Sequence, residues 1–201
     1  MPNTSRVAGL IPVQYLNGAP WNGQTRTYFI PSGDTNAYAI GDPVDFGGSA
    51  DANGVPSIVL ATAGNNSGAN MLCGAIVAVG TQESVVGNIL TPDSIIVPAT
   101  KTVAYYVQVA DDPNILFQMQ EGGTNAALAA TNVSQNVDLA SGANNGYVSG
   151  WVIDNATTTT GSGFQLKLLG LTRTSNNAFG TYAKWLVKIN LHRFSAGVAG
   201  V

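Results

Sequence analysis

The side chains that could perform acid, base or nucleophile chemistry are few in this chain of 201 residues. The only histidine, His192, lies near the end of the run TYAKWLVKINLHRF at residues 181–194. A hydrolase triad would need this histidine beside a serine or cysteine on a sharp strand-to-helix turn, and no such motif is present. We therefore expect His192 to be a surface residue on the solvent-facing side of a strand, without a catalytic role.

Asp111 and Asp112 are the best candidates for paired carboxylates, but adjacent residues of a strand point to opposite faces of a sheet. They open the sequence Asp-Asp-Pro-Asn at residues 111–114. Proline fixes φ there and Asx side chains bond nearby amides, so this sequence predicts a structural turn. No zinc or calcium ligand spacing occurs, and no glycine run has the context of a phosphate-binding loop. We therefore expect no enzyme activity, no metal and no cofactor.

The single cysteine, Cys73, lies in the apolar run LCGAIVAVG with no histidine or lysine beside it. We expect a small buried hydrophobic side chain there, because nothing nearby would activate the thiol. The N-terminal residues contain no apolar signal-peptide core, and no run approaches the length of a membrane span. The sequence therefore predicts cytoplasmic synthesis and no membrane partner.

The run at residues 181–194 has a period of two, which indicates a strand with one packed face and one wet face. Apolar residues occupy one face: Ala183, Trp185, Val187, Ile189 and Leu191. Polar residues occupy the other: Lys184, Lys188, Asn190 and His192. Because Trp185 falls on the packed face, away from the lysines, we expect a core anchor and no base stacking on nucleic acid.

The charge of the chain is low in amount and uneven in distribution. Charged residues make up only 9% of the chain, against roughly 25% in ordinary globular proteins. All 11 acidic residues lie at or before Asp154, and five of the 8 basic residues follow it. A basic C-terminal segment could meet an acidic protein surface or nucleic acid, unless the two blocks simply mix in the fold.

Glycine and proline, with 24 and 9 copies, divide the chain into short segments typical of β-sandwiches and barrels. Strands are expected at residues 25–31, 37–46, 56–62, 72–80, 103–110, 115–120, 164–171 and 181–194. We expect the two strands beside Asp-Asp-Pro-Asn to form a hairpin, residues 155–163 to be a hairpin connection, and residues 124–133 to contain a helical turn. Residues 1–24 read as an extended arm over this domain or a neighbour, and residues 25–201 as one β-sandwich domain.

Several ordered pieces resemble small virion structural proteins of tailed bacteriophages, which include capsid decoration (cement) proteins. The pieces are YYVQVADDPNILFQMQ, NVDL, FQLKLLGL and GTYAKWLVKINLH, mainly within residues 103–192, with a weaker likeness in GLIPVQYLNGAPWNGQ. The resemblance implies an all-β subunit, a jelly-roll-like antiparallel β-sandwich, that binds the outside of an icosahedral shell. The resembling pieces contain no catalytic motif. The insertion NATTTTGSG cannot be matched to the family.

The resemblance implies a decoration protein that stabilises junctions between major capsid protein subunits, and the low charge of the chain is compatible with such a role. Its expected partner is the major capsid protein, on which it would form a homo-oligomer, without direct contact to nucleic acid. Its expected location is the capsid exterior of the virion, after synthesis in the host bacterial cytoplasm. The expected contact residues are Leu10, Ile11, Tyr15, Trp21, Lys184, Lys188 and Arg193.

Two other functions stay open on sequence grounds. A head-fibre or tail-associated module could bind a host surface or glycan through exposed aromatic residues, with Tyr38, Tyr147 and Trp151 as candidates. A glycoside-active enzyme would require two acidic side chains to converge in one cleft, which the spacing of the carboxylates does not favour.

Overall fold

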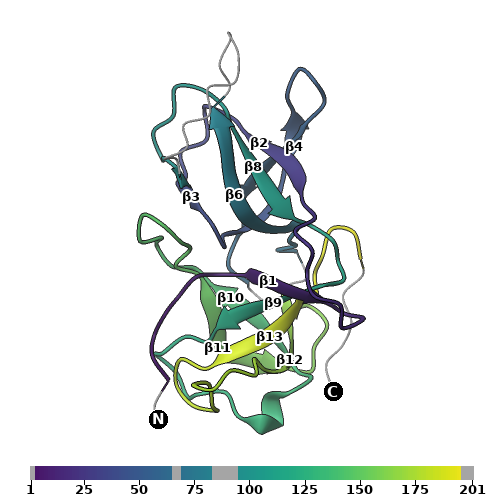
Figure 1. The fold of residues 1–201 in the computed structure, drawn as a ribbon, viewed down its shortest axis with the longest axis vertical. Helices are drawn as coiled ribbons and strands as arrows, with labels where there is room; N and C mark the ends of the chain where they lie inside the picture. Colours follow the sequence, from purple (N-terminus) through teal and green to yellow (C-terminus); the bar gives the residue numbers. More distant parts are fainter. Residues whose placement is uncertain (1–2, 65–68, 83–94, 196–201) are drawn as a thin grey trace.

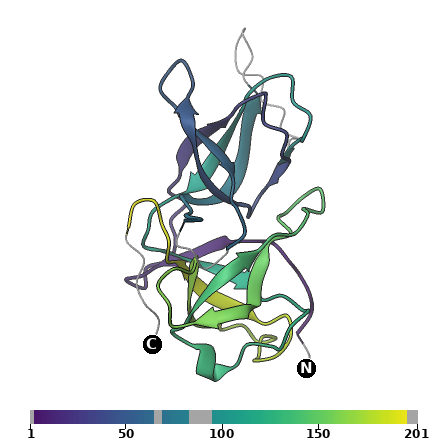
Figure 2. The ribbon, with the colours of Figure 1, turned by 180° about the vertical axis from the view of Figure 1, so that it is seen from behind.

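The computed structural model describes residues 3–64, 69–82 and 95–195. These residues form strands β1–β13 and one short 3-10 turn, η1 (Ala130–Asn132), so the predicted all-β class is confirmed. Figures 1 and 2 show two stacked β-structures along the long axis of the molecule. Two buried hydrophobic clusters accompany them, one in each half.

The first half is a closed barrel whose strands lie between residues 26 and 110. Its order is β2 (Arg26–Ile30), β5 (Pro56–Leu60), β4 (Pro43–Ala50), β6 (Gly74–Gln82) and β8 (Tyr105–Ala110). A small sheet of β3 (Tyr38–Ala39) and β7 (Ile96–Val97) lies beside the barrel. Cys73 is fully buried in the barrel cluster, as predicted, and burial raises the pKa of its thiol.

The second half is a six-stranded sheet built mainly from the C-terminal part of the chain. Its order is β1 (Ile11–Tyr15), β9 (Ile115–Gln120), β13 (Lys184–Ile189), β12 (Leu166–Leu171), β10 (Asn136–Ala140) and β11 (Val152–Thr159). The sheet curls until β11 reaches the end of β9, where the Gly122 N–H donates to the Ile153 carbonyl at 2.9 Å. Curling lets one face enclose a core.

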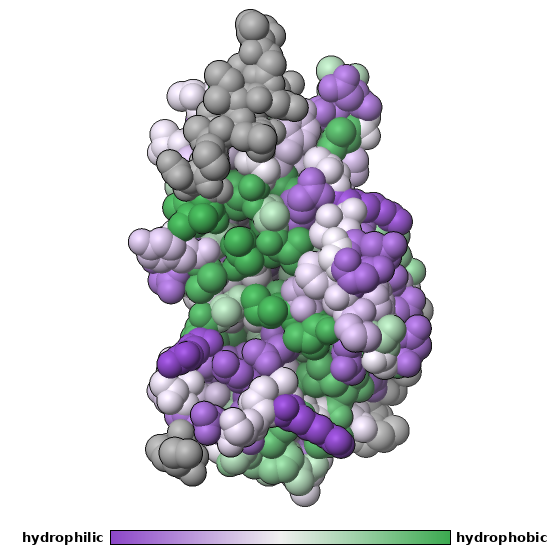
Figure 3. Space-filling view, in the orientation of Figure 1, coloured by the Kyte–Doolittle hydropathy of each residue, from purple (hydrophilic) through white to green (hydrophobic). Residues whose placement is uncertain are grey.

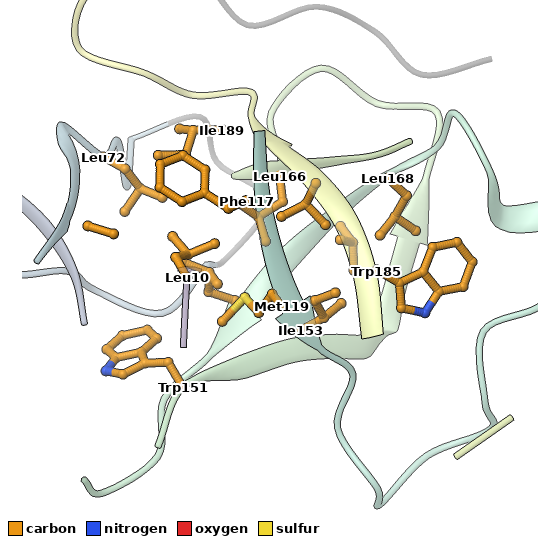
Figure 4. Packing of buried hydrophobic residues seen from close by; sticks show 14 of the residues in the cluster. Leu10, Leu72, Phe117, Met119, Trp151, Ile153, Leu166, Leu168, Trp185 and Ile189 are labelled. Atoms are coloured by element: carbon orange, nitrogen blue, oxygen red, sulfur yellow. The ribbon is translucent and has the colours of Figure 1, made fainter. Parts of the chain in front are cut away.

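Trp185 lies in the core enclosed by this sheet and is 0% exposed, so its predicted role as a core anchor is confirmed. Figure 4 shows Phe117, Met119, Ile153 and Leu168 among the side chains of the same cluster. These residues come from strands that are far apart in the sequence. Strand β13, which lies between β9 and β12, places Trp185 among them.

The predicted hairpin at Asp-Asp-Pro-Asn is wrong. Strand β8 pairs with β2 and β6 in the barrel, whereas β9 pairs with β1 and β13 in the sheet. Each strand is flanked on both sides, so neither has a free edge for the other. The local turn chemistry is nevertheless as expected: Asp112 Oδ1 accepts from the Asn114 N–H at 2.7 Å. This turn is a junction between the two halves.

The predicted hairpin connection at residues 155–163 is also wrong. Residues 155–159 belong to β11, and β10 lies between β11 and β12 in the sheet. The Asn155 amide is buried and donates to the carbonyls of Gly122, Asn125 and Ala126 at 3.0–3.3 Å. Because this side chain satisfies three carbonyls of a neighbouring loop, the start of the polar run is part of the folded structure.

The predicted boundary between an arm and a domain at residue 24 stays a prediction. The structure shows that Ile11–Tyr15, within the predicted arm, is the edge strand β1 beside β9. The preceding residues reach the barrel, where the Leu10 N–H donates to the Gly41 carbonyl at 2.9 Å. Gly9 and Gly41 both have positive φ, and the carbonyl of Gly41 would collide with a Cβ at Gly9. This close approach therefore requires glycine.

Candidate interaction surface

The predicted contact residues of the N-terminal segment do not all lie on the surface. Leu10 is 0% exposed and belongs to the core of the six-stranded half. Tyr15 and Trp21 are partly buried against the same core, and the Tyr15 hydroxyl donates to Asn22 Oδ1 at 2.8 Å. Leu10 therefore contributes to the fold of its own chain, while Ile11, Tyr15 and Trp21 keep part of their surface available.

An apolar groove of about 380 Å³ lies between the two halves. Ile11, Pro12 and Trp21 line it from the N-terminal segment, and Ile40, Val77 and Ala78 line it from the barrel side. No charged residue is part of this lining in the described chain. Figure 3 shows apolar surface gathered over this waist, between the barrel and the sheet. Two predicted contact residues, Ile11 and Trp21, therefore line the same groove as Ile40, Val77 and Ala78, which were not predicted from the sequence.

The three predicted basic contact residues have three different surroundings. Arg193 forms a bidentate ion pair with Asp45 of β4, with Nε to Oδ1 at 2.6 Å and Nη2 to Oδ2 at 2.5 Å. Lys188 lies opposite Lys167 on β12 and is partly buried, and burial followed by the charge of Lys167 lowers its pKa. Arg193 therefore ties the C-terminal segment to the barrel, and Lys188 faces a like charge.

Lys184 lies in a second, polar cleft of about 380 Å³. Asn3, Thr4 and Arg6 line one side, residues 174–177 line the other, and Tyr182 completes the lining. Sequence reasoning identified Lys184 but missed Arg6, because the two cations lie at opposite ends of the chain. Only the loop that folds back beside the N-terminal segment brings them together.

The prediction that His192 and Asn190 lie on a wet face is wrong. His192 is 1% exposed and Asn190 is 3% exposed. Strand β13 ends at Ile189, and the chain then runs against the barrel, where Arg193 N–H donates to the Leu72 carbonyl at 2.9 Å. After Ile189 the period-two pattern therefore no longer predicts which side chains are exposed to solvent.

The buried His192 ring has one defined hydrogen bond. Its Nδ1 accepts from the Phe194 N–H at 3.1 Å, so this nitrogen carries no proton in the neutral ring. Burial, aided by the charge of Lys188 and opposed by Asp112, lowers the His192 pKa to about 4. This ring is a neutral structural group at pH 7, not a surface histidine.

Asp111 and Asp112 of the Asp-Asp-Pro-Asn turn have different partners. Asp111 accepts from the Tyr28 hydroxyl at 2.7 Å and pairs with Arg26 at 3.4 Å, while Asp112 caps the turn. No group of three or more metal-ligating side chains occurs within the described residues. The same part of the chain contains no helix that is long and apolar enough to cross a membrane.

Of the aromatic residues considered for glycan binding, Tyr38 and Trp151 are wrong candidates. They are 0% and 3% exposed and pack in the two cores, whereas Tyr147 is 65% exposed. The Tyr38 hydroxyl donates to Asp34 Oδ2 at 2.9 Å, and the buried Lys101 ammonium lies 5.6 Å from the centre of its ring. Tyr38 therefore supports the barrel.

Comparisons with protein-family models, with curated protein sequences and with solved structures found no match.

Proposed function

We propose that this chain is a capsid decoration protein of a tailed bacteriophage, which binds the outer surface of the head and stabilises junctions between major capsid protein subunits. The proposal rests on the sequence resemblance and on the apolar groove between the two halves. Its action is binding without catalysis, as a homo-oligomer on the virion exterior. The jelly-roll-like form that the resemblance implies stays a prediction beside the barrel and curled sheet described above.

The single observation that carries the proposal is the lining of the groove. Ile11, Trp21 and Ile40 present apolar surface where a monomer gains nothing by exposing it. Since the described lining holds no charged residue, an extended and uncharged segment of a capsid subunit is the occupant that fits it. The indole N–H of Trp21, which lines the groove, is buried and has no acceptor among the described residues.

Binding of many such copies would stabilise the shell through linked equilibria, because a ligand that binds only the assembled state shifts assembly in its favour. The low charge of the chain suits this role, since few long charged side chains must be ordered when a neighbour docks.

Ala78→Asp tests the proposal, because it places a charge in the groove without removing core volume. We expect the variant to fold normally and to lose at least about tenfold in affinity for heads of the phage that encodes this chain. Co-sedimentation of purified protein with heads that lack it measures the affinity. Tyr147→Asp, at a side chain that is 65% exposed and lies outside the groove, is the matched control and should bind normally.

Wild-type protein that does not bind these heads, or equal binding of Ala78→Asp and Tyr147→Asp, would overturn the assignment of the groove to the capsid.

A further inference from the structure

The polar cleft beside Lys184 is a separate site with a different chemistry from the apolar groove. Two cations, Arg6 and Lys184, line it, and no acidic residue does so in the described chain. The described ion pairs join Arg26, Lys101 and Arg193 to aspartates and involve neither of the two cleft cations. An uncompensated pair of cations in a hollow favours an anionic ligand.

Side-chain hydrogen bonds hold one side of the cleft to the other. The Asn3 side chain donates to the Ala178 carbonyl at 2.8 Å and accepts from the Ala178 N–H at 3.1 Å. The Arg6 N–H donates to Gln120 Oε1 at 2.6 Å, and this contact fixes the N-terminal segment on β9. The N-terminal wall is therefore positioned before any ligand arrives.

The loop that forms the opposite wall is equally well fixed. The Asn177 amide donates to the carbonyls of Thr172 and Lys184 at 2.9 and 2.6 Å, and its Oδ1 accepts from the Lys184 N–H at 2.8 Å. These bonds leave the side chains of Thr174, Ser175 and Asn176 exposed along the cleft. Their hydroxyl and amide groups can exchange hydrogen bonds with ligand hydroxyls.

Tyr182 gives the cleft an aromatic ring in an unusual backbone conformation. Its φ is 65°, a left-handed value that a tyrosine rarely adopts. The ring packs against Gly123, where any Cβ would collide with it. Strained residues of this kind persist where the surroundings fix them, often at binding sites.

We propose that this cleft binds an acidic saccharide, with the carboxylate at Arg6 and Lys184 and the hydroxyls on the side chains of residues 174–176. Its volume of about 380 Å³ falls in the roughly 300–1,000 Å³ range of small-ligand sites. The lining is rich in hydroxyl and amide side chains and has no aliphatic side chain, a composition that suits a hydroxyl-rich ligand. A hydroxyl-rich anion fits the polar lining better than a peptide does.

Galacturonic acid and galactose are matched probes, because they differ at C6, where one has a carboxylate and the other a neutral CH₂OH group. Titration of the full chain, followed by calorimetry or by amide chemical shifts, should show galacturonic acid binding at least about tenfold more tightly than galactose. N-acetylneuraminic acid tests a second carboxylate-bearing sugar. Binding of the acids should weaken as salt concentration rises.

Arg6→Gln with Lys184→Gln should reduce galacturonic acid affinity by about tenfold or more, since each cation contributes a charge-assisted hydrogen bond. Arg173→Gln removes an exposed cation that does not line the cleft and should leave affinity unchanged. Equal affinities for galacturonic acid and galactose, or for the double variant and Arg173→Gln, would overturn the proposal.

Two further probes separate other anions from a saccharide. If acetate binds with the same affinity as galacturonic acid, the cleft recognises a carboxylate alone. If a triglutamate peptide binds more tightly than galacturonic acid, the ligand is an acidic protein segment. Either result would overturn the saccharide assignment. Capsid binding by Ala78→Asp is a separate measurement, so failure here leaves the assignment of the apolar groove untouched.

Discussion

At the scale of single residues, His192 shows how burial changes the meaning of a side chain. Its pKa is lowered from 6.5 to about 4, so the unfolded state takes up a proton at higher pH than the folded state does. Stability from this group is therefore complete above pH 6.5 and decreases as pH falls toward 4. The loss is on the order of 3 kcal/mol, because one pKa unit corresponds to about 1.4 kcal/mol.

His192→Asn should remove this acid sensitivity, because the Asn Oδ1 can still accept from the Phe194 N–H while no group titrates. Urea unfolding of both proteins at pH 7 and pH 4.5 measures the two losses in the free energy of unfolding. The wild type should lose more than the variant, whatever their difference at pH 7. Equal losses would show that other groups cause the acid sensitivity of the fold.

Glu121 is a second buried titratable residue, and its effect on the pH dependence of stability is opposite to that of His192. It is 0% exposed, and its Oε2 accepts from the Leu128 N–H at 3.1 Å and from the Trp185 indole N–H at 3.2 Å. Burial raises its pKa, so its ionisation costs stability as pH rises through the folded-state pKa. The acid sensitivity of His192→Asn must therefore be compared with that of the wild type, since Glu121 and His192 have opposite effects on the pH dependence of stability.

At the scale of elements, the segment after β13 acts as a clamp between the two halves. Arg193 pairs with Asp45, and the Phe194 ring meets Phe46 edge-on at 5.7 Å between ring centres. Arg193→Gln should lower the free energy of unfolding by about 1 kcal/mol, a modest value because the pair is partly exposed. A double-mutant cycle with Asp45→Asn should give a coupling of similar size.

The matched control for the clamp is Arg173→Gln, which removes an exposed arginine and should change stability by less than about 0.5 kcal/mol. Additive effects of Arg193→Gln and Asp45→Asn would show that the ion pair contributes nothing to the folded state.

The strands also show which features of the fold could be predicted from the sequence and which could not. Alternation at Trp185, Val187 and Ile189 predicted a strand and its packed face correctly, because side-chain direction in a strand is a local property. The partners of β8 and β9 could not be predicted from the turn between them, since pairing depends on strands far away in the chain. For the same reason, no local pattern could place Arg6 beside Lys184.

At the scale of the whole molecule, the N-terminal segment of residues 3–24 contributes to the folded core as well as to the surface. Leu10 fills the core of the sheet half, and its N–H binds the barrel at Gly41. Removal of residues 1–24 would therefore delete the edge strand β1 and part of a core, so loss of capsid binding by such a truncation would not identify a contact. Point variants in the groove avoid this ambiguity.

Leu10→Ala tests this view of the N-terminal segment, because it removes buried volume without changing the exposed surface. We expect a loss of about 2–5 kcal/mol in the free energy of unfolding, as for other leucines deleted from a close-packed core. Leu16→Ala, at a side chain that is 54% exposed, is the control and should change stability by less than about 0.5 kcal/mol. Equal stabilities of the two variants in urea would contradict the role of Leu10 in the core of the sheet half.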